Sequence, residues 1–356
     1  MPLCKHTRWL RLSRKDHSFV LETSDRAERL LDNLPTPEEQ WPSLLTLVGN
    51  QSKLQVLREL GIANTGARGK RGHGEVHLSI VPSTERTDCP VLVADGDIPV
   101  QNKLGRPLKP QLCHEMSVRQ FPNDPVPEKP VHIADRIYYR AIFPFTDVIC
   151  FFATDLGGIG RVVQQLARWV DGGRPSTMEF RPWLVIVVDD GVEEDMLSLF
   201  WDLTRTETTI DMMDTFGGVR VISLSKIIPR RGRRRSHRGP WDTLTQELLN
   251  LIQLPRLVRT RLRCLFSALH FAGFLSHAAA RTTETPREPF DFVLSSRSSN
   301  PIASDLGVHL SRFLDHFKSV DALQAFAIPM MASFFNLDHY LPGMHREWRE
   351  AAYICT

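Results

Sequence analysis

The sequence predicts an α/β protein with a doubly wound, mostly parallel sheet followed by a helical extension. Between about residues 40 and 226, apolar segments rich in β-branched residues alternate with segments of helical pattern. Strands that are apolar throughout are typical of a sheet covered by helices on both faces. Beyond a basic stretch at 229–239 the pattern becomes helical. These observations together give the predicted fold class.

The predicted strands are short and apolar, and one of them alternates polar and apolar residues as an edge strand does. The strands are Ser43–Val48, the alternating Glu75–Val81, Pro90–Asp95, Asp147–Ala153, Trp183–Val188 and Val219–Leu224. The helices expected around them are Ser24–Leu34, Leu54–Leu60, Asp135–Phe143, Gly160–Val170 and Glu193–Arg205. The helices of the extension are Trp241–Ile252, Leu257–Ala280, Ala303–Phe317 and Val320–Phe335.

This pattern divides the 356 residues into four segments, and the chain is long enough to bury a large core. Proline and polar residues dominate 99–130, which predicts an insertion. The four segments are a polar N-terminal segment (1–40), the α/β domain (41–228), a basic linker (229–239) and the helical extension (240–356).

The composition, with 42% hydrophobic and 24% charged residues, is that of a folded protein. The net charge of +3 places any attraction to nucleic acid or membranes in a local patch. The six cysteines form no C-x-x-C pair, so a structural zinc site is not expected. No secretory leader and no apolar run of 18 or more residues is present, which predicts a cytoplasmic protein without a transmembrane segment.

The most informative motif is an apolar strand that runs into Gly49 and then into a predicted helix. A phosphate-binding P-loop begins in this way, because the glycine permits the turn and the helix offers N–H groups to an anion. The second glycine, the lysine and the serine or threonine of G-x-x-x-x-G-K-[ST] are missing from their positions. The alternative is an ordinary strand–turn–helix connection. The candidate nucleotide-binding residues here are Gly49, Asn50, Gln51, Ser52 and Lys53.

Asp95 and Gly96 complete this candidate site. A carboxylate at the end of a downstream apolar strand is where a P-loop NTPase holds magnesium, so Asp95 is the candidate Mg²⁺ ligand. In Asp-x-x-Gly the glycine would fall on Ile98, and the alternative is an aspartate that caps a turn. Asp189 and Asp190 end another apolar strand, where a turn is the favoured interpretation. A second glycine–lysine pair within 64–71 lacks a preceding strand.

Four segments together resemble the dynamin-like GTPase region of large fungal multidomain proteins, which often carry a patatin-like lipid acyl hydrolase domain or a zinc-binding module. The segments are 41–49, 74–78, 90–95 and 138–151, and similarity to the following helical region extends the resemblance over 41–345. It implies a P-loop NTPase-like fold with GTP and Mg²⁺ as possible ligands, with Gly49 as the first P-loop glycine. The missing lysine and serine put hydrolysis in doubt. No Gly-x-Ser-x-Gly nucleophile motif of a lipase is present.

The stretch 230–238 is strongly basic and suggests docking on an anionic membrane surface or nucleic acid, or nuclear import. A solvated linker is the alternative. The arginines are Arg230, Arg231, Arg233, Arg234, Arg235 and Arg238. His309 and His316 are two helical turns apart, too far for chelation from one helix.

Three functions follow from the sequence. The first is a pseudo-GTPase with degraded nucleotide-binding motifs, which acts as a regulatory or interaction module on an unknown protein partner. The second is an active GTPase whose P-loop is misrepresented in this sequence, with a few residues near Gln51 left out. The third is a scaffold without nucleotide that docks through its basic stretch. The chain is also expected to be a fragment of a longer protein.

Overall fold

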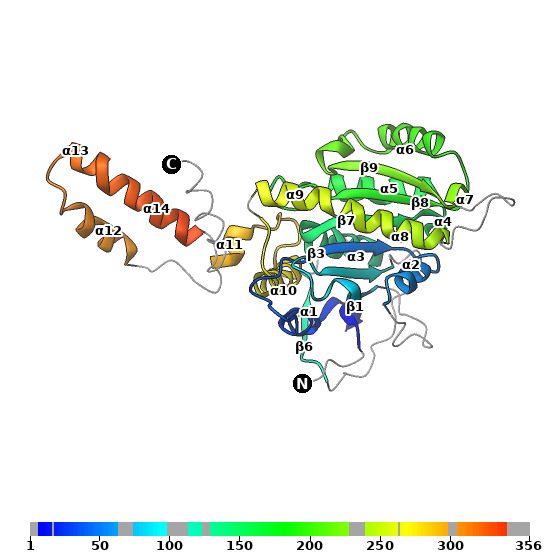
Figure 1. Cartoon of the computed structure of the whole chain (residues 1–356), viewed down its shortest axis with the longest axis horizontal. Helices are drawn as coiled ribbons and strands as arrows, with labels where there is room; N and C mark the ends of the chain where they lie inside the picture. Colours follow the sequence, from blue (N-terminus) through cyan, green and yellow to red (C-terminus); the bar gives the residue numbers. More distant parts are fainter. Residues whose placement is uncertain are drawn as a thin grey trace. The chain divides into compact units, whose positions relative to one another are not determined.

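The computed structural model describes residues 6–15, 18–62, 74–97, 113–122, 129–227, 239–262, 264–297 and 305–339. The chain forms two compact units, residues 1–290 and 291–356. This division lies at a different place from the boundaries expected from the sequence. The first unit contains the sheet and the helices that cover it (Figure 1).

Within the described residues, nine strands form a single sheet in the order β6-β2-β1-β4-β5-β3-β7-β8-β9. Five neighbouring strands are parallel, and the other four join them by antiparallel pairing. The parallel strands are β3 (Ser43–Val48), β5 (Val91–Gly96), β7 (Thr146–Phe152), β8 (Trp183–Val188) and β9 (Gly218–Ser223). The antiparallel strands are β1 (Arg8–Lys15), β2 (Ser18–Ser24), β4 (Glu75–Ile80) and β6 (Met116–Gln120).

The prediction of a mostly parallel, P-loop NTPase-like sheet is wrong, because four of the eight strand pairings in the described part of the chain are antiparallel. Strands β1, β2 and β6 were not predicted from the sequence. Strand β1 carries four basic residues among its eight, so it lacks the apolar pattern used to recognise strands. Two of these basic residues, Arg8 and Arg11, are buried in the sheet and form ion pairs with Glu75.

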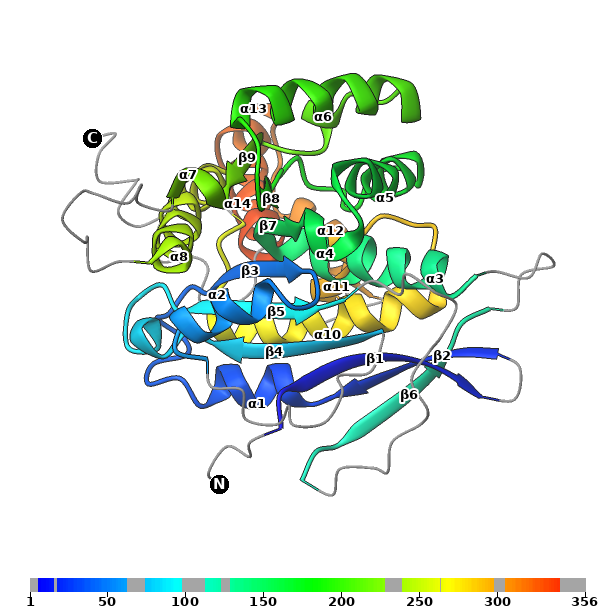
Figure 2. The same ribbon diagram turned by 90° about the vertical axis from the view of Figure 1, so that its right-hand side faces the viewer.

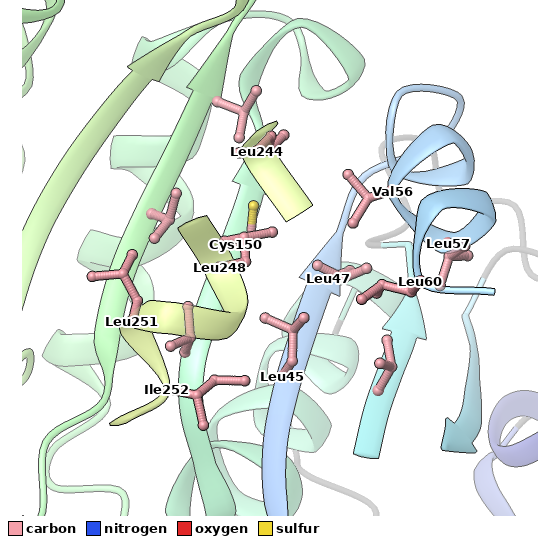
Figure 3. Close-up of a cluster of buried hydrophobic side chains, with 14 of the residues drawn as sticks. Leu45, Leu47, Val56, Leu57, Leu60, Cys150, Leu244, Leu248, Leu251 and Ile252 are labelled. Carbon is pink, nitrogen blue, oxygen red and sulfur yellow. The ribbon is translucent and has the colours of Figure 1, made fainter. Parts of the chain in front are cut away.

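One face of the parallel strands packs against α2 (Lys53–Glu59) and α8 (Pro240–Leu251). Side chains from alternate strand positions, such as Leu45 and Leu47, meet Val56 of α2 and Leu248 of α8 in one apolar cluster. Figure 3 shows this cluster, with Cys150 of β7 at its centre. The burial of aliphatic side chains from several strands and two helices fixes this face of the sheet.

The opposite face is covered by aromatic side chains. Trp169 of α5 (Ile159–Asp171) lies 5.6 Å from the ring of Phe151 on β7 and stacks on Tyr138 at 6.1 Å. Tyr138 belongs to η2 (Ile137–Ile142), a π-helical segment that continues α3 (Pro130–Arg136). The helix expected over Asp135–Phe143 therefore begins earlier, at Pro130, and changes type within its length. Helices α5 and α6 (Glu193–Glu207) pack against one another, as Figure 2 shows.

The remaining helices of the first unit pack around the sheet and its ends. Helix α10 contacts α1 and η2, so it connects segments that are far apart in the sequence. The break after α9 divides the single helix expected over 257–280 into two. The helices are α1 (Arg26–Asp32), α4 (Ala153–Leu156), α7 (Leu224–Ile227), α9 (Gln253–Arg261) and α10 (Ala268–Glu284), with short 3-10 turns η1 (Pro82–Thr84), η3 (Phe143–Phe145) and η4 (Met212–Asp214).

The second unit is helical, as the sequence predicts. In the described residues its helices are α11 (Phe292–Arg297), α12 (Leu306–Leu314), α13 (Val320–Ala322), η5 (Leu323–Ala327) and α14 (Ile328–His339). His309 bonds to Asp305 and His316 to the carbonyl of Arg312, so each histidine has a partner close by in sequence. None of the helices described is both long and apolar enough to cross a bilayer.

Candidate functional site

The carboxyl ends of three parallel strands meet at one edge of the sheet. The strand register pairs Val48 of β3 with Gly96 of β5 and with Phe151 of β7. The turn that follows β3, the end of β5 and the helix α4 that follows β7 are therefore neighbours. This edge is the usual ligand site of open α/β sheets, and it contains all the residues predicted for nucleotide binding.

The carboxylate of Asp155, on α4, fills the turn after β3. Its Oδ2 atom accepts hydrogen bonds from the backbone N–H of Asn50 at 2.7 Å and of Ser52 at 2.9 Å. Its Oδ1 atom accepts a third from the Ser52 hydroxyl at 2.9 Å. Converging N–H groups form a cradle for an anion, so this turn binds an anion that the chain itself supplies.

Gly49 permits the close approach of α4. A Cβ atom at this position would lie 2.9 Å from both Oδ2 of Asp155 and Cβ of Phe152. The φ angle of Gly49 is not positive, so the position does not need a left-handed conformation. Glycine is needed there because it leaves room for the neighbouring side chains. The next residues, Asn50 and Gln51, have exposed side chains. Gly49 is therefore required by the contact that closes the cradle.

Lys53 does not point into the turn but into the sheet. Its Nζ atom lies 2.8 Å from Oδ1 of Asp95 and donates a hydrogen bond to the carbonyl of Gly96 at 2.7 Å. Both side chains of the ion pair are buried, with 3% and 5% of their surface exposed. The pair compensates the charges that burial would otherwise make costly. Lys53 thus belongs to the interior, against the expectation of a phosphate contact.

Tyr138 closes the inner side of this site. Its Oη atom would lie 2.0 Å from a Cβ at position 96, so only glycine fits there. Burial raises the pKa of the Tyr138 phenol well above its ordinary value, and the negative charges of Asp97 and Asp95 raise it further. The phenol is therefore neutral at physiological pH and contributes no charge to the site.

GTP and Mg²⁺ do not fit this arrangement. A phosphate would have to displace Asp155 from the cradle, and it would meet no free lysine, because Lys53 is paired with Asp95. The same ammonium group lies against the carboxylate that was expected to hold Mg²⁺, where a second cation would be repelled. The arrangement is a strand–turn–helix connection in which the chain's own Asp155 and Asp95 occupy the positions of an anionic ligand.

Comparisons with known proteins find little similarity. No family model matches the sequence, and no curated protein does. Among solved structures, the siderophore hydrolase EstA from Aspergillus nidulans matches 69% of this chain and 94% of its own, with 11% identity and a TM-score of 0.25. At that TM-score the match carries neither fold nor activity to this chain.

The expected resemblance to a dynamin-like GTPase region is therefore wrong. No family model supports it, and half of the strand pairings in the described residues are antiparallel. The predictions of a P-loop NTPase-like fold, of GTP binding and of a pseudo-GTPase are wrong as well. The strand-and-turn pattern that carried the resemblance is real in the structure, but it is an element of local geometry that many α/β proteins share.

Other predicted sites are placed as follows. The basic stretch with its six arginines, and the glycine–lysine pair within 64–71, lie outside the described residues. Asp189 and Asp190 are exposed in the turn after β8, where the Asp189 carbonyl accepts a hydrogen bond from Ser225 N–H at 3.0 Å.

Asp155 was not predicted as a site residue, although the sequence carries one signal for it. Asp155 follows the apolar strand β7 and precedes Gly157 and Gly158, both of which have positive φ. An acid between a buried strand and two glycines is a strand-end polar group of the same kind as Asp95. Its partners are more than 100 residues away in sequence, so the pairing itself was not visible.

A second missed feature is a cavity of about 510 Å³ between α3, η2 and α5, away from the sheet edge. Four arginines and two aspartates line it, an excess of two positive charges. Burial raises the pKa of Asp135 although the guanidinium of Arg168, 3.0 Å away, opposes this shift. The charged lining residues are Arg136, Arg140, Arg168, Arg287, Asp135 and Asp171.

Proposed function

We propose that this protein is a non-hydrolytic interaction module. One observation carries the proposal: the anion cradle at the carboxyl edge of the sheet is filled by the chain's own Asp155. An enzyme that transfers phosphoryl groups needs fixed positive charge at that place, and here the place holds a carboxylate. The site is built for stability and not for turnover.

The energetics support this proposal. Hydrogen bonds to a charged acceptor contribute about 1.5–3 kcal/mol each, and Asp155 accepts them from two backbone N–H groups and one hydroxyl. An incoming phosphate must replace all of them and overcome the repulsion between two anions. Because Asp155 is attached to the same chain, it competes at a high effective concentration.

Phosphate and nucleotide binding test the proposal directly. For the wild-type chain we expect no change in the unfolding temperature with inorganic phosphate, GTP or ATP, each with Mg²⁺. The Asp155→Ala variant is expected to be less stable but to gain a phosphate-dependent rise in that temperature, because its cradle is open. Asp189→Ala removes an exposed aspartate from a neighbouring turn and serves as the matched control.

Two results would contradict the proposal. One is micromolar binding of GTP or ATP to the wild-type chain with measurable hydrolysis. The other is an Asp155→Ala variant that folds, as judged by a cooperative transition, but binds no phosphate, since the turn would then not be an anion cradle at all.

The arginine-lined cavity suggests the chemistry of the partner. Guanidinium groups bind carboxylates in bidentate geometry, and the lining has more arginines than aspartates. We propose that an acidic segment of a partner protein places a carboxylate there. In support, Arg168 is partly exposed, with 39% of its side-chain surface accessible.

A further inference from the structure

Two histidines and a cysteine lie together beside the antiparallel half of the sheet. His6 precedes β1, and Cys113 and His114 precede β6. One potential ligand atom from each of the three lies within 4.8 Å of the others, and Nδ1 of His6 is 3.0 Å from Sγ of Cys113. His6 is more than 100 positions away in sequence from the adjacent Cys113 and His114, so the fold brings it to them.

The histidine at the buried end of this cluster is held by a carboxylate. The His114 side chain is fully buried, and its Nδ1 atom lies 2.5 Å from Oδ1 of Asp25. When Nδ1 donates its proton to a carboxylate, the lone pair for a metal is on Nε2. A carboxylate behind a ligating histidine is the usual outer partner of zinc sites, where it fixes the tautomer and ring orientation.

Asp25 is itself held in place from the other side. Its Oδ2 atom accepts a hydrogen bond from Nε of Arg29 at 2.6 Å, and another nitrogen of this guanidinium donates to the carbonyl of Cys113 at 2.8 Å. The backbone N–H of Asp25 bonds to the carbonyl of Glu115 at 3.1 Å. These bonds fix the segment that carries Cys113 and His114 relative to Asp25.

We propose that His6, Cys113 and His114 form a zinc site, with Asp25 as the outer partner of His114. One thiolate and two imidazoles are ligands of the type that zinc prefers over magnesium or calcium. Zinc–ligand bonds of about 2.0–2.3 Å place ligand atoms about 3.3–3.6 Å apart in a tetrahedron. Side-chain rotations that move the ligand atoms by about 1 Å therefore complete the site. Water takes the fourth position, and exposed His6 gives access to the ion.

Binding requires only the loss of one proton. The Cys113 thiol releases its proton to solvent as the sulfur–zinc bond forms, and no group is oxidised or reduced. The site goes beyond the interaction function proposed above and does not depend on it. Because it joins the segment before β1 to the segment before β6, zinc should stabilise the outer strands of the sheet.

Titration of the full chain with Zn²⁺ against a chromophoric chelator tests this site. We expect one high-affinity equivalent per chain, and with Co²⁺ a sulfur-to-metal charge-transfer band. Cys113→Ser and His114→Ala should each weaken zinc binding more than about 100-fold, and Asp25→Asn about 10–100-fold. Cys89→Ser, at another partly buried cysteine, should leave both readouts unchanged.

A cooperative unfolding transition, measured with a chelator present to remove metal, shows whether each variant is folded. Absence of a high-affinity equivalent in the wild-type chain would overturn the proposal, as would zinc binding that persists undiminished in folded Cys113→Ser. A zinc-dependent rise in unfolding temperature that is lost in folded His6→Ala and His114→Ala would support it.

Discussion

At the scale of single residues, the glycines at the sheet edge record close contacts and not a phosphate motif. Gly49 makes room for α4, and Gly96 makes room for the phenol of Tyr138. Both glycines were chosen from the sequence as ligand-binding residues. Their actual role is steric, and it is set by the side chains of Tyr138 on η2 and Asp155 on α4, which are distant in sequence.

The contact between Gly96 and Tyr138 makes a quantitative prediction. A Cβ in Gly96→Ala would lie 2.0 Å from Oη of Tyr138, and we expect the free energy of unfolding to fall by about 1–3 kcal/mol, as overpacking typically does. In a Tyr138→Phe background the nearest remaining ring carbon is 3.1 Å away, so the same substitution should cost less. Urea unfolding of the four proteins of this cycle measures the difference.

Gly273→Ala provides the control for this cycle. Gly273 lies within α10, and a Cβ there would meet no atom within 4 Å. Alanine should therefore be neutral or stabilise the chain by about 0.5–1 kcal/mol. Equal effects of Gly96→Ala in both backgrounds would show that the phenol is not the cause.

At the scale of elements, the sequence predicted what local pattern determines and missed what pairing determines. Strands β3 and β8 were predicted with the bounds that the structure has. A short apolar run between turn signals is typical of a buried strand, so the local pattern was sufficient. Strands β1 and β2 were missed, because β1 buries Arg8 and Arg11. The charges of these arginines are compensated by Glu75 on β4, a partner that the local sequence of β1 does not reveal. The pairing of Asp155 with the turn after β3 was hidden for the same reason, since both partners are polar and far apart in sequence.

The buried charges between β1 and β4 predict a dependence of stability on pH. Burial by itself would raise the pKa of Glu75, but His77 and the guanidinium groups of Arg11 and Arg8 together lower it below its ordinary value of 4.5. A carboxyl whose pKa is lowered by folding stabilises the folded chain above the unfolded pKa and loses this effect as pH falls through the folded pKa. The free energy of unfolding should therefore decline as the pH falls below about 4.5.

Glu75→Gln tests the origin of this decline. The variant should be less stable at pH 7, because the buried guanidinium groups lose a compensating charge, and its stability should fall less steeply than that of the wild type below about pH 4.5. Glu207→Gln, on the exposed surface of α6, should retain the wild-type slope. Parallel pH profiles for the wild type and Glu75→Gln would exclude Glu75 as the source.

At the scale of the whole molecule, the two candidate anion sites are in opposite states. The cradle at the sheet edge is filled by Asp155, whereas the arginine-lined cavity has an open volume of about 510 Å³ and an excess of positive charge. Three separate segments build this cavity, from 132–140, 168–172 and 286–287. Only the folded first unit brings these segments together, so binding of a ligand in the cavity requires residues 1–290 to be folded.

The excess of arginine over aspartate in the cavity predicts that the chain binds an acidic ligand there. With a fluorescent peptide of alternating glutamate and serine as the probe, Arg287→Gln and Arg168→Gln should each weaken binding about tenfold, which corresponds to about 1.4 kcal/mol. Binding should also weaken as ionic strength rises, because the attraction is between charges that solvent partly screens. Arg205→Gln, an arginine on α6 with 77% of its side chain exposed, is the matched control and should bind as the wild type does. Equal losses in all three variants would assign the attraction to the net charge of the surface, and no loss in Arg287→Gln and Arg168→Gln would remove the cavity as the site.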